Sequence, residues 1–448
     1  MISSLFFQAK PPERISFIHA LLPLPFTFKE SNMSSSPEIF LTNSPDGPIV
    51  AYDASSGTVV GQFTGSRSPR QGLTVVGEDF GKTYIAASHI SPTTGSGSIH
   101  LYNWWSSTAF HNLPVPEPVA PLAASFDGLY LFAGGISGSV HTLSVPSGNV
   151  LKTLPAHNKP VTCLSVNHDE SLLISGSDDG TIAIVPIFRL VGDWACENVE
   201  DIILHKFAAH SDSVTAIVSG TGLCYSQIIS CSEDSTCKFW SLRRGTHLRT
   251  VVFPCMIYGI TLHPTEPEFY AAGSDGSIHI GSFMVGSRKL VIQGSELMTL
   301  PHKHNGAVVS VVMVNAGRNL VSASEDGSVW IWKLGEGQVN RVIMAFGNEM
   351  TSISDMVSAT GIDYNKGHSA SEVGKGGATK CSIGSSCEEL IKSMPAMRMI
   401  EMEDLSKVAA KDRSRAIDTL ESAIAIYEKL LELILKEAKK GTRSSKER

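Results

Sequence analysis

A short phrase recurs along this chain with the same residue types at the same offsets. "SASEDGSVWIW" (322–332) and "SCSEDSTCKFW" (230–240) share a serine, an acid and a tryptophan, and "SGSDDGTIAIV" (175–185) keeps all but the tryptophan. Further copies surround Asp46, Gly97, Gly138 and Asp275. A phrase repeated every 40 to 55 residues or so is typical of propeller blades with loop insertions. We therefore expect seven repeated units over residues 38–346.

Each unit is expected to hold four short strands. In the fourth unit they are "VTCLSVN", "SLLISGS", "TIAIVPI" and "DIILHKF", separated by turn residues. Such a sheet cannot bury both faces alone, but sheets stacked radially cover one another. The predicted fold class is all-β, a seven-bladed β-propeller followed by a C-terminal α-helix that forms a coiled coil. The first unit begins at "EIFLTN" and lacks one strand, which "TSISDMV" after the seventh unit is a candidate to supply.

The repeated phrase also carries polar residues that suggest a buried network. In "SASEDGSVWIW" Asp326 and Gly327 form the hairpin turn, because glycine accepts a positive φ. The phrase resembles the WD40 family, in which His, Ser or Thr, Asp and Trp form a hydrogen-bonded tetrad across one blade. The resemblance implies structural, non-catalytic tetrads, with Val185 in place of the fourth blade's tryptophan. The residues are His304, Ser322, Asp326 and Trp332; His210, Ser230, Asp234 and Trp240; and His157, Ser175 and Asp179.

The composition shifts along the chain predict further segments. Residues 1–33 are expected to be a disordered or mis-annotated extension before Met33, with a targeting peptide in "ISFIHALLPLPF" as the alternative. The propeller is expected over 34–357, and the Gly- and Ser-rich residues 358–395 form a flexible linker. A helix is predicted over 396–440, followed by a basic tail at 441–448. This tail fits nuclear import, RNA contact or simple solvation.

The C-terminal helix carries apolar residues at alternating steps of three and four. This heptad seam predicts a dimerising coiled coil. The alternative is a lone amphipathic helix that folds back on the propeller. The seam residues are Ile417, Leu420, Ile424, Tyr427, Leu431 and Ile434.

Several kinds of chemistry are not expected. No apolar run reaches the 18 or so residues that cross a bilayer, and the formal charge of -7 argues against a surface that binds phosphate throughout. "VGEDFGKT" (76–83) is one residue short of a phosphate-binding loop. "HKH" (302–304) lacks further ligands, so we expect no metal, cofactor or catalytic site. The eight cysteines show no C-x-x-C pair and are interpreted as free thiols in a reducing compartment rather than disulfides or zinc ligands.

The amino-acid sequences of the repeated units resemble those of one family in particular. "EIFLTNSPDGPIVAYDASSG", "AHNKPVTCLSVNHDESLLISGSDDGTI" and the heptad tail are similar to the WD-repeat subunit of the pre-ribosomal processing complex, and within it to the plant root-initiation-defective proteins. The resemblance covers about residues 34–448. It implies a non-enzymatic scaffold of the nucleus, nucleolus and nucleoplasm that serves large-subunit assembly, spacer RNA processing and export.

The resemblance also implies partners. These are scaffold proteins of the complex, the precursor of the large ribosomal subunit, a midasin-type ATPase and a second copy of the chain through the C-terminal helix. It further implies a role in replication-origin licensing in some members, and in meristem and root development in plants. The alternative from another class is a substrate adaptor of a cullin-type ubiquitin ligase.

Overall fold

The structure is a computed structural model. It covers residues 38–77, 83–104, 106–192, 199–220, 227–242, 244–282, 291–293, 297–334, 341–347 and 352–359. The predicted extension (1–33), most of the linker, the heptad helix and the basic tail lie outside these described residues.

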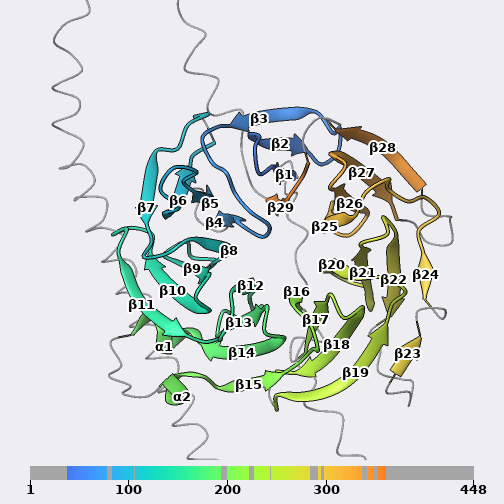
Figure 1. The fold of residues 1–448 in the computed structure, drawn as a ribbon. Helices are drawn as coiled ribbons and strands as arrows, with labels where there is room; N and C mark the ends of the chain where they lie inside the picture. Colours follow the sequence, from blue (N-terminus) through green and yellow to red (C-terminus); the bar gives the residue numbers. More distant parts are fainter. Residues whose placement is uncertain are drawn as a thin grey trace, which may run out of the picture.

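Seven four- or five-stranded sheets are arranged around a central axis (Figure 1). Blade 1 contains β1 (Ile39–Asn43), β2 (Ile49–Asp53), β3 (Val59–Phe63) and β29 (Asp355–Ala359). Blade 2 contains β4 (Leu73–Val76), β5 (Tyr84–Ile90), β6 (Gly97–Tyr102) and β7 (His111–Pro114). Blade 3 contains β8 (Val119–Ala124), β9 (Tyr130–Gly135), β10 (Ser139–Ser144) and β11 (Val150–Pro155). Blade 4 contains β12 (Val161–Val166), β13 (Leu172–Ser177), β14 (Thr181–Pro186) and β15 (His205–Ala208).

The remaining three blades follow in chain order. Blade 5 contains β16 (Val214–Ser219), β17 (Gln227–Ser232), β18 (Thr236–Ser241), β19 (Thr246–Val252) and β23 (Val291–Gln293). Blade 6 contains β20 (Ile257–Leu262), β21 (Glu268–Gly273), β22 (Ile278–Ser282) and β24 (Met298–Thr299). Blade 7 contains β25 (Val308–Val314), β26 (Asn319–Ser324), β27 (Ser328–Lys333) and β28 (Arg341–Gly347). The all-β, seven-bladed prediction is confirmed.

The ring is closed by a strand from the far end of the propeller. β29 pairs antiparallel with β1, with Ile39 opposite Ala359 and Asn43 opposite Asp355. The segment "TSISDMV" therefore supplies the start of the missing inner strand, which begins at Asp355. Because β29 covers the edge of β1, the first blade has the same four strands as its neighbours.

Apolar residues of neighbouring blades form shared cores. Phe40 of β1 packs in one cluster with Val321 and Ile331 of blade 7. Tyr270 of β21 packs in another with Trp332 of β27. The strands alternate or run apolar because each blade is covered on both faces by its neighbours.

Hydroxyl groups on the inner strands connect consecutive blades. Thr162 of blade 4 donates to the carbonyl of Val214, and Thr215 of blade 5 donates to the carbonyl of Ile257. Ser310 of blade 7 donates to the carbonyl of Met356, 3.2 Å away on the closing strand. These bonds use the carbonyl groups of the next blade's inner strand, so blades 4, 5 and 7 are each fixed against the following blade.

One predicted strand is only partly a strand. In "DIILHKF" the first residues belong to α2 (Val199–Ile202), and β15 starts at His205. α1 (Ile187–Val191) and α2 are inserted between β14 and β15, and buried Leu190 and Ile202 join the blade 4 core. A short apolar run serves a buried helix as well as a strand, so its length alone did not separate the two.

The expectation of free thiols was wrong for one pair of cysteines. Cys231 and Cys237 form a disulfide, whereas Cys163 and Cys255 are free. The two bonded residues lie directly opposite each other in the β17–β18 hairpin, with Cα atoms 4.2 Å apart. Facing positions of an antiparallel pair bring side chains close together, and this register was not read from the sequence.

Candidate functional site

The predicted polar residues of blade 7 come together in its interior. His304 Nε2 and the indole Nε1–H of Trp332 each lie 2.8 Å from Ser322 Oγ, and the indole donates to that hydroxyl. His304 Nδ1 lies 2.7 Å from Ser328 Oγ rather than on Asp326. Asp326 accepts the backbone N–H of Ser328 at 2.8 Å, which shapes the hairpin turn. All polar atoms of this chain of contacts have partners, as burial requires.

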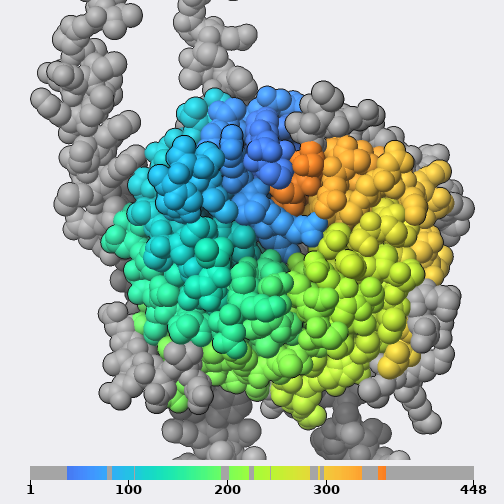
Figure 2. All heavy atoms as spheres, viewed as in Figure 1, coloured from blue at the N-terminus to red at the C-terminus, as the bar shows by residue number. Residues whose placement is uncertain are grey.

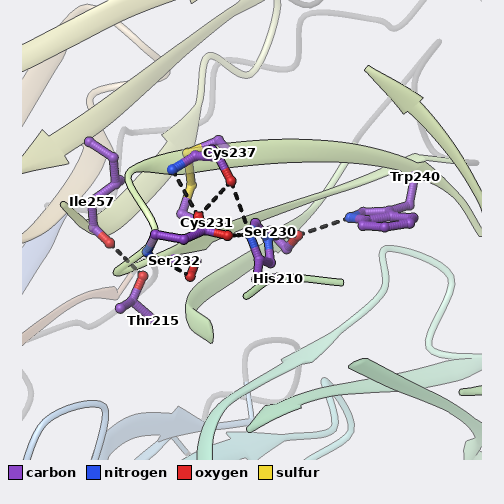
Figure 3. Close-up of a disulfide and its surroundings, with 10 residues drawn as sticks. His210, Thr215, Ser230, Cys231, Ser232, Cys237, Trp240 and Ile257 are labelled. Atoms are coloured by element: carbon purple, nitrogen blue, oxygen red, sulfur yellow. Dashed lines mark hydrogen bonds and ion pairs between the residues drawn. A yellow bond between two sulfur atoms is a disulfide. The ribbon is translucent and has the colours of Figure 1, made fainter. Parts of the chain in front are cut away.

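Blade 5 repeats the arrangement of His210, Ser230 and Trp240, which are labelled in Figure 3, and adds a direct contact with the acid. His210 Nδ1 lies 3.0 Å from Asp234 Oδ2, and His210 Nε2 lies 2.8 Å from Ser230 Oγ. Trp240 Nε1 donates to Ser230 Oγ at 2.9 Å. Burial alone would raise the pKa of Asp234, but hydrogen bonds from His210 and Thr236 outweigh it and lower the pKa strongly.

Blade 4 makes the same contacts without a tryptophan. His157 Nε2 lies 2.8 Å from Ser175 Oγ, and His157 Nδ1 lies 2.7 Å from Thr181 Oγ1. Thr181 in turn donates to Asp179 at 2.5 Å. Ser175 Oγ lies 3.4 Å from the carbonyl of Ala183, which takes the place of the indole partner next to Val185.

Sequence reasoning missed one member of these networks. The residue two positions after each turn acid (Thr181, Thr236 or Ser328) places its hydroxyl on the histidine. The signal was present, because each of the three repeats has Ser or Thr at this offset. A hydroxyl group both donates and accepts hydrogen bonds, so it can bridge the acid and the histidine, whereas a carboxylate only accepts.

Burial controls the charge of two of these histidines, His157 and His304. It lowers the pKa of His157 and of His304 to about 4, against the weaker opposing effect of Asp179 and Asp326. The rings are therefore neutral at pH 7 and act as hydrogen-bonding groups of the core. Hydrogen bonding of this kind stabilises a blade and exposes no reactive atom to a substrate.

Blades 3 and 6 replace the tetrad with a histidine four residues after the turn. In blade 3, His141 Nε2 lies 2.8 Å from Glu117 Oε1, and Ser137 Oγ donates to the same oxygen at 2.7 Å. In blade 6, His279 Nε2 lies 3.6 Å from Cys255 Sγ. Burial and then the charge of Asp275 raise the pKa of Cys255 to about 11, so its free thiol is not an activated nucleophile.

One mouth of the central channel is covered by a loop between β3 and β4, residues 65–72, which we call the capping loop. Gln71 Nε2 donates to the carbonyl of Thr215 in blade 5 at 2.6 Å, and the Gln71 carbonyl accepts from Leu122 N in blade 3. Arg70 lies 4.2 Å over the ring of Tyr258 in blade 6 and 3.1 Å from Glu325 in blade 7. The blue segment after β3 turns toward the axis in Figure 1, and blue atoms reach the centre of the ring in Figure 2.

Below the capping loop the inner strands surround a cavity of about 410 Å³. Its lining consists mainly of small and apolar residues, with Asp355 as the carboxylate among the described lining residues. Asp355 is 8% exposed and accepts hydrogen bonds from the backbone N–H groups of Leu73 and Met356. Burial raises the pKa of Asp355 to about 7, against these bonds and the charge of Arg70.

The outer rim carries exposed apolar side chains. Val59 of β3 is 54% exposed, Leu151 of β11 is 45% exposed and Met298 of β24 is 71% exposed. β23 leaves blade 6 and adds in parallel to β19 of blade 5, so the rims of these two blades are joined. Strand edges and exposed apolar groups at a rim are features that protein partners use.

The structure does not test the prediction about the phosphate-binding loop, whereas it does bear on the prediction about a membrane span. Residues 78–82 of "VGEDFGKT" lie outside the described part of the chain. Within the described part, no helix is long and apolar enough to cross a membrane.

The ring of seven blades, the turn acids and the buried histidine networks resemble those of WD-repeat β-propellers. The family model described as "WD domain, G-beta repeat" matches residues 148–184, 202–241 and 294–333. These matches include the three blades whose histidine networks follow the tetrad pattern.

The chain is also similar to individual proteins of known name. The chain is 38% identical over 295 residues to Protein ROOT INITIATION DEFECTIVE 3 of Arabidopsis thaliana, covering 66% of this chain and 65% of that protein. It is 25% identical to WD repeat-containing protein 18 of Homo sapiens, covering 67% and 68%. It is 23% identical to pre-rRNA-processing protein crb3/ipi3 of Schizosaccharomyces pombe, covering 66% and 72%. The predicted resemblance to root-initiation-defective and pre-rRNA-processing WD-repeat proteins is confirmed.

Proposed function

We propose that this chain is a non-enzymatic scaffold subunit of a nuclear complex that assembles the large ribosomal subunit. The observation that carries the proposal is the similarity, over 66% and 60% of this chain, to two proteins named for pre-rRNA processing. The aligned part covers 65% of the Arabidopsis relative, so partners and substrates of the whole protein belong to the proposal.

The arrangement of the blades supports a role in placement rather than chemistry. The conspicuous acid and histidine side chains satisfy each other inside the blades, as at His210 and Asp234. The capping loop covers one mouth of the channel, so the loops between strands and the outer rims of the blades are the broad surfaces on which partner proteins can bind. A rigid ring with exposed apolar rim residues such as Val59 and Leu151 is suited to hold several proteins at once.

The finer parts of the proposal follow the family resemblance. The propeller binds scaffold proteins of the processing complex in the nucleolus and nucleoplasm and attaches to the precursor of the large subunit. Its contact with a midasin-type ATPase is indirect or transient. The heptad seam around Ile424 and Leu431 dimerises the chain. In a plant, failure of this assembly would also disturb meristem and root growth, and replication-origin licensing is a further role of the same scaffold.

The test combines depletion with rescue. Depleting the protein is expected to accumulate spacer-containing precursors of the large-subunit RNA, and full-length protein restores their processing. A variant lacking residues 396–448 is expected to bind scaffold partners poorly while its blades stay folded. Normal precursor levels after depletion would contradict the proposal.

A second measurement separates the ubiquitin-ligase alternative. Affinity purification with mass spectrometry should recover ribosome-assembly factors with the full-length chain. Recovery of cullin components in their place would support the adaptor function. For dimerisation, light scattering should give a dimer for the wild type and a monomer for the Ile424→Asp/Leu431→Asp variant, because charges at a seam are costly to bury.

A further inference from the structure

Blade 6 brings a thiol, a carboxylate and an imidazole to one point. Cys255 Sγ lies 3.4 Å from Asp275 Oδ1 and 3.6 Å from His279 Nε2. The three ligating atoms all lie within 4.8 Å of one another. The cluster joins the loop before β20 to the β21–β22 hairpin, which is the connection that the tetrad histidine makes in blades 4, 5 and 7.

A glycine opens space beside this cluster. Blades 4, 5 and 7 have a serine two residues before the turn acid, and its hydroxyl accepts the backbone N–H of that acid, as Ser177 does for Asp179. Blade 6 has Gly273 at this position. A Cβ at Gly273 would lie 2.6 Å from Asp275 Oδ1 and 2.8 Å from Cys255 Sγ, so any larger residue would occupy the site.

Blade 3 provides an internal comparison. It also has a glycine at this offset, Gly135, and a histidine four residues after the turn, His141. There the longer Glu117 fills the space, and its Oε1 bonds His141 Nε2 directly at 2.8 Å. In blade 6 the shorter cysteine leaves its sulfur 3.6 Å from the imidazole nitrogen, which is an ordinary distance for a hydrogen bond to sulfur and equally a normal separation for two ligands of one metal.

We propose that blade 6 binds one Zn²⁺ through Cys255 Sγ, Asp275 Oδ1 and His279 Nε2. On a tetrahedral zinc, with Zn–S of about 2.3 Å and Zn–N or Zn–O of about 2.0–2.2 Å, the sulfur lies roughly 3.5–3.7 Å from a nitrogen or oxygen ligand. The separation of Cys255 Sγ from His279 Nε2, 3.6 Å, falls in this range, and that from Asp275 Oδ1, 3.4 Å, lies just below it. A thiolate with an imidazole selects zinc over magnesium or calcium. The thiolate and carboxylate balance the charge of the ion, and a water molecule takes the fourth position.

The surroundings hold the three ligands in place. Ser277 donates its backbone N–H to Asp275 Oδ1 at 3.0 Å and its hydroxyl to Oδ2 at 2.8 Å. Lys303 Nζ lies 3.8 Å from Oδ2, so it approaches the other carboxylate oxygen. The His279 ring is 3% exposed and packs edge-on against Phe253, with ring centroids 5.3 Å apart. Cys255 is half-buried, which leaves a path for the ion from solvent.

The first experiment measures zinc in the purified full-length protein. The protein is stripped with a chelator, equilibrated with Zn²⁺, passed through a desalting column and analysed for metal. Cys255→Ser and His279→Gln are expected to lose about one zinc per chain relative to the wild type. Glu117→Gln, the matched change in blade 3, should keep the wild-type content. Equal zinc in all four proteins would overturn the proposal.

The second experiment needs no variant, so it stands even if a substituted blade fails to fold. The wild-type protein is alkylated at its thiols with and without Zn²⁺, and labelling of the Cys255 peptide is followed by mass spectrometry. Zinc should slow labelling of Cys255 severalfold while magnesium leaves it unchanged. The same labelling rate with and without zinc would show that the cluster is only a hydrogen-bonded substitute for the tetrad.

Discussion

Among single residues, Trp332 shows how a residue that recurs in the repeats contributes to folding stability. Its ring is fully buried, and its N–H reaches Ser322. Trp332→Ala should destabilise the protein by about 3–5 kcal/mol, the usual cost of deleting a buried aromatic. Trp332→Phe should cost about 1–2 kcal/mol, because it removes chiefly the hydrogen bond. Denaturant unfolding of both variants measures the difference.

Trp330 is the matched control for that substitution. It lies two residues away on the same strand, is half-buried, and stacks on His304 with centroids 4.2 Å apart. Trp330→Ala is expected to cost clearly less than Trp332→Ala. Equal losses at the two positions would contradict the role of the buried indole.

The buried histidines should make the blades sensitive to acid. The folded-state pKa of His304 is about 4, below the ordinary value of 6.5, so its contribution to stability is complete above pH 6.5 and is lost as the pH falls toward 4. His304→Gln should therefore be much less stable than the wild type at pH 7, and the gap should narrow at pH 5. Melting temperatures of both proteins at the two pH values test this.

Comparing the wild type with His304→Gln cancels the effect of a second titrating group, Asp355. Asp355 has a raised pKa of about 7, so its effect runs the other way and stability falls as the pH rises from about 4 to 7. Both proteins contain Asp355, and its contribution cancels in their difference. A gap that stays constant from pH 7 to pH 5 would exclude the neutral, buried histidine.

The sequence predicted these networks only in part. His157, Ser175 and Asp179 could be found because three repeats align on one turn acid. The clusters of blades 3 and 6 could not, since Glu117 and Cys255 do not fit the tetrad pattern and lie 20 or more positions from their histidines. Which side chains meet there depends on the packing of a loop over a hairpin, and no local period reports it.

At the scale of elements, the closing strand β29 decides whether the ring is complete. A chain truncated after residue 351 lacks β29 and exposes the edge of β1, whereas one truncated after residue 359 keeps the pairing from Ile39 to Asn43. The shorter chain should melt at a clearly lower temperature and aggregate, because an open apolar strand edge pairs with other chains. Both lack the tail, so the comparison isolates β29.

Thermal melting with light scattering follows both effects. Identical melting and scattering for the two truncated chains would show that β29 contributes nothing to closure. The sequence indicated this strand because the first repeated unit has one strand fewer than the others. It did not predict α1, α2 or β23, because insertions in a blade follow no repeat and their apolar runs are short.

At the scale of the whole molecule, the capping loop joins blades that are not neighbours in the ring. Arg70 spans blades 6 and 7, and Gln71 spans blades 3 and 5. Gln71 has a φ of 56°, so the loop holds a left-handed residue to aim this side chain and carbonyl. A contact made across the axis resists separation of the blades in a way that contacts between neighbours do not.

The Arg70→Ala/Gln71→Ala variant tests this connection. It removes a cation–π contact worth about 0.5–1 kcal/mol and a hydrogen bond worth about 0.5–1.5 kcal/mol, while the exposed Arg70–Glu325 pair adds little. We expect a lower melting temperature and faster hydrogen exchange on the inner strands facing the cavity, with the outer strands unchanged. Arg67→Ala is the control, because Arg67 is exposed in the same loop and its backbone bond to His89 is kept. If Arg67→Ala lowers stability as much, or if exchange rises on the outer strands alone, the loop does not tie the ring together across its axis.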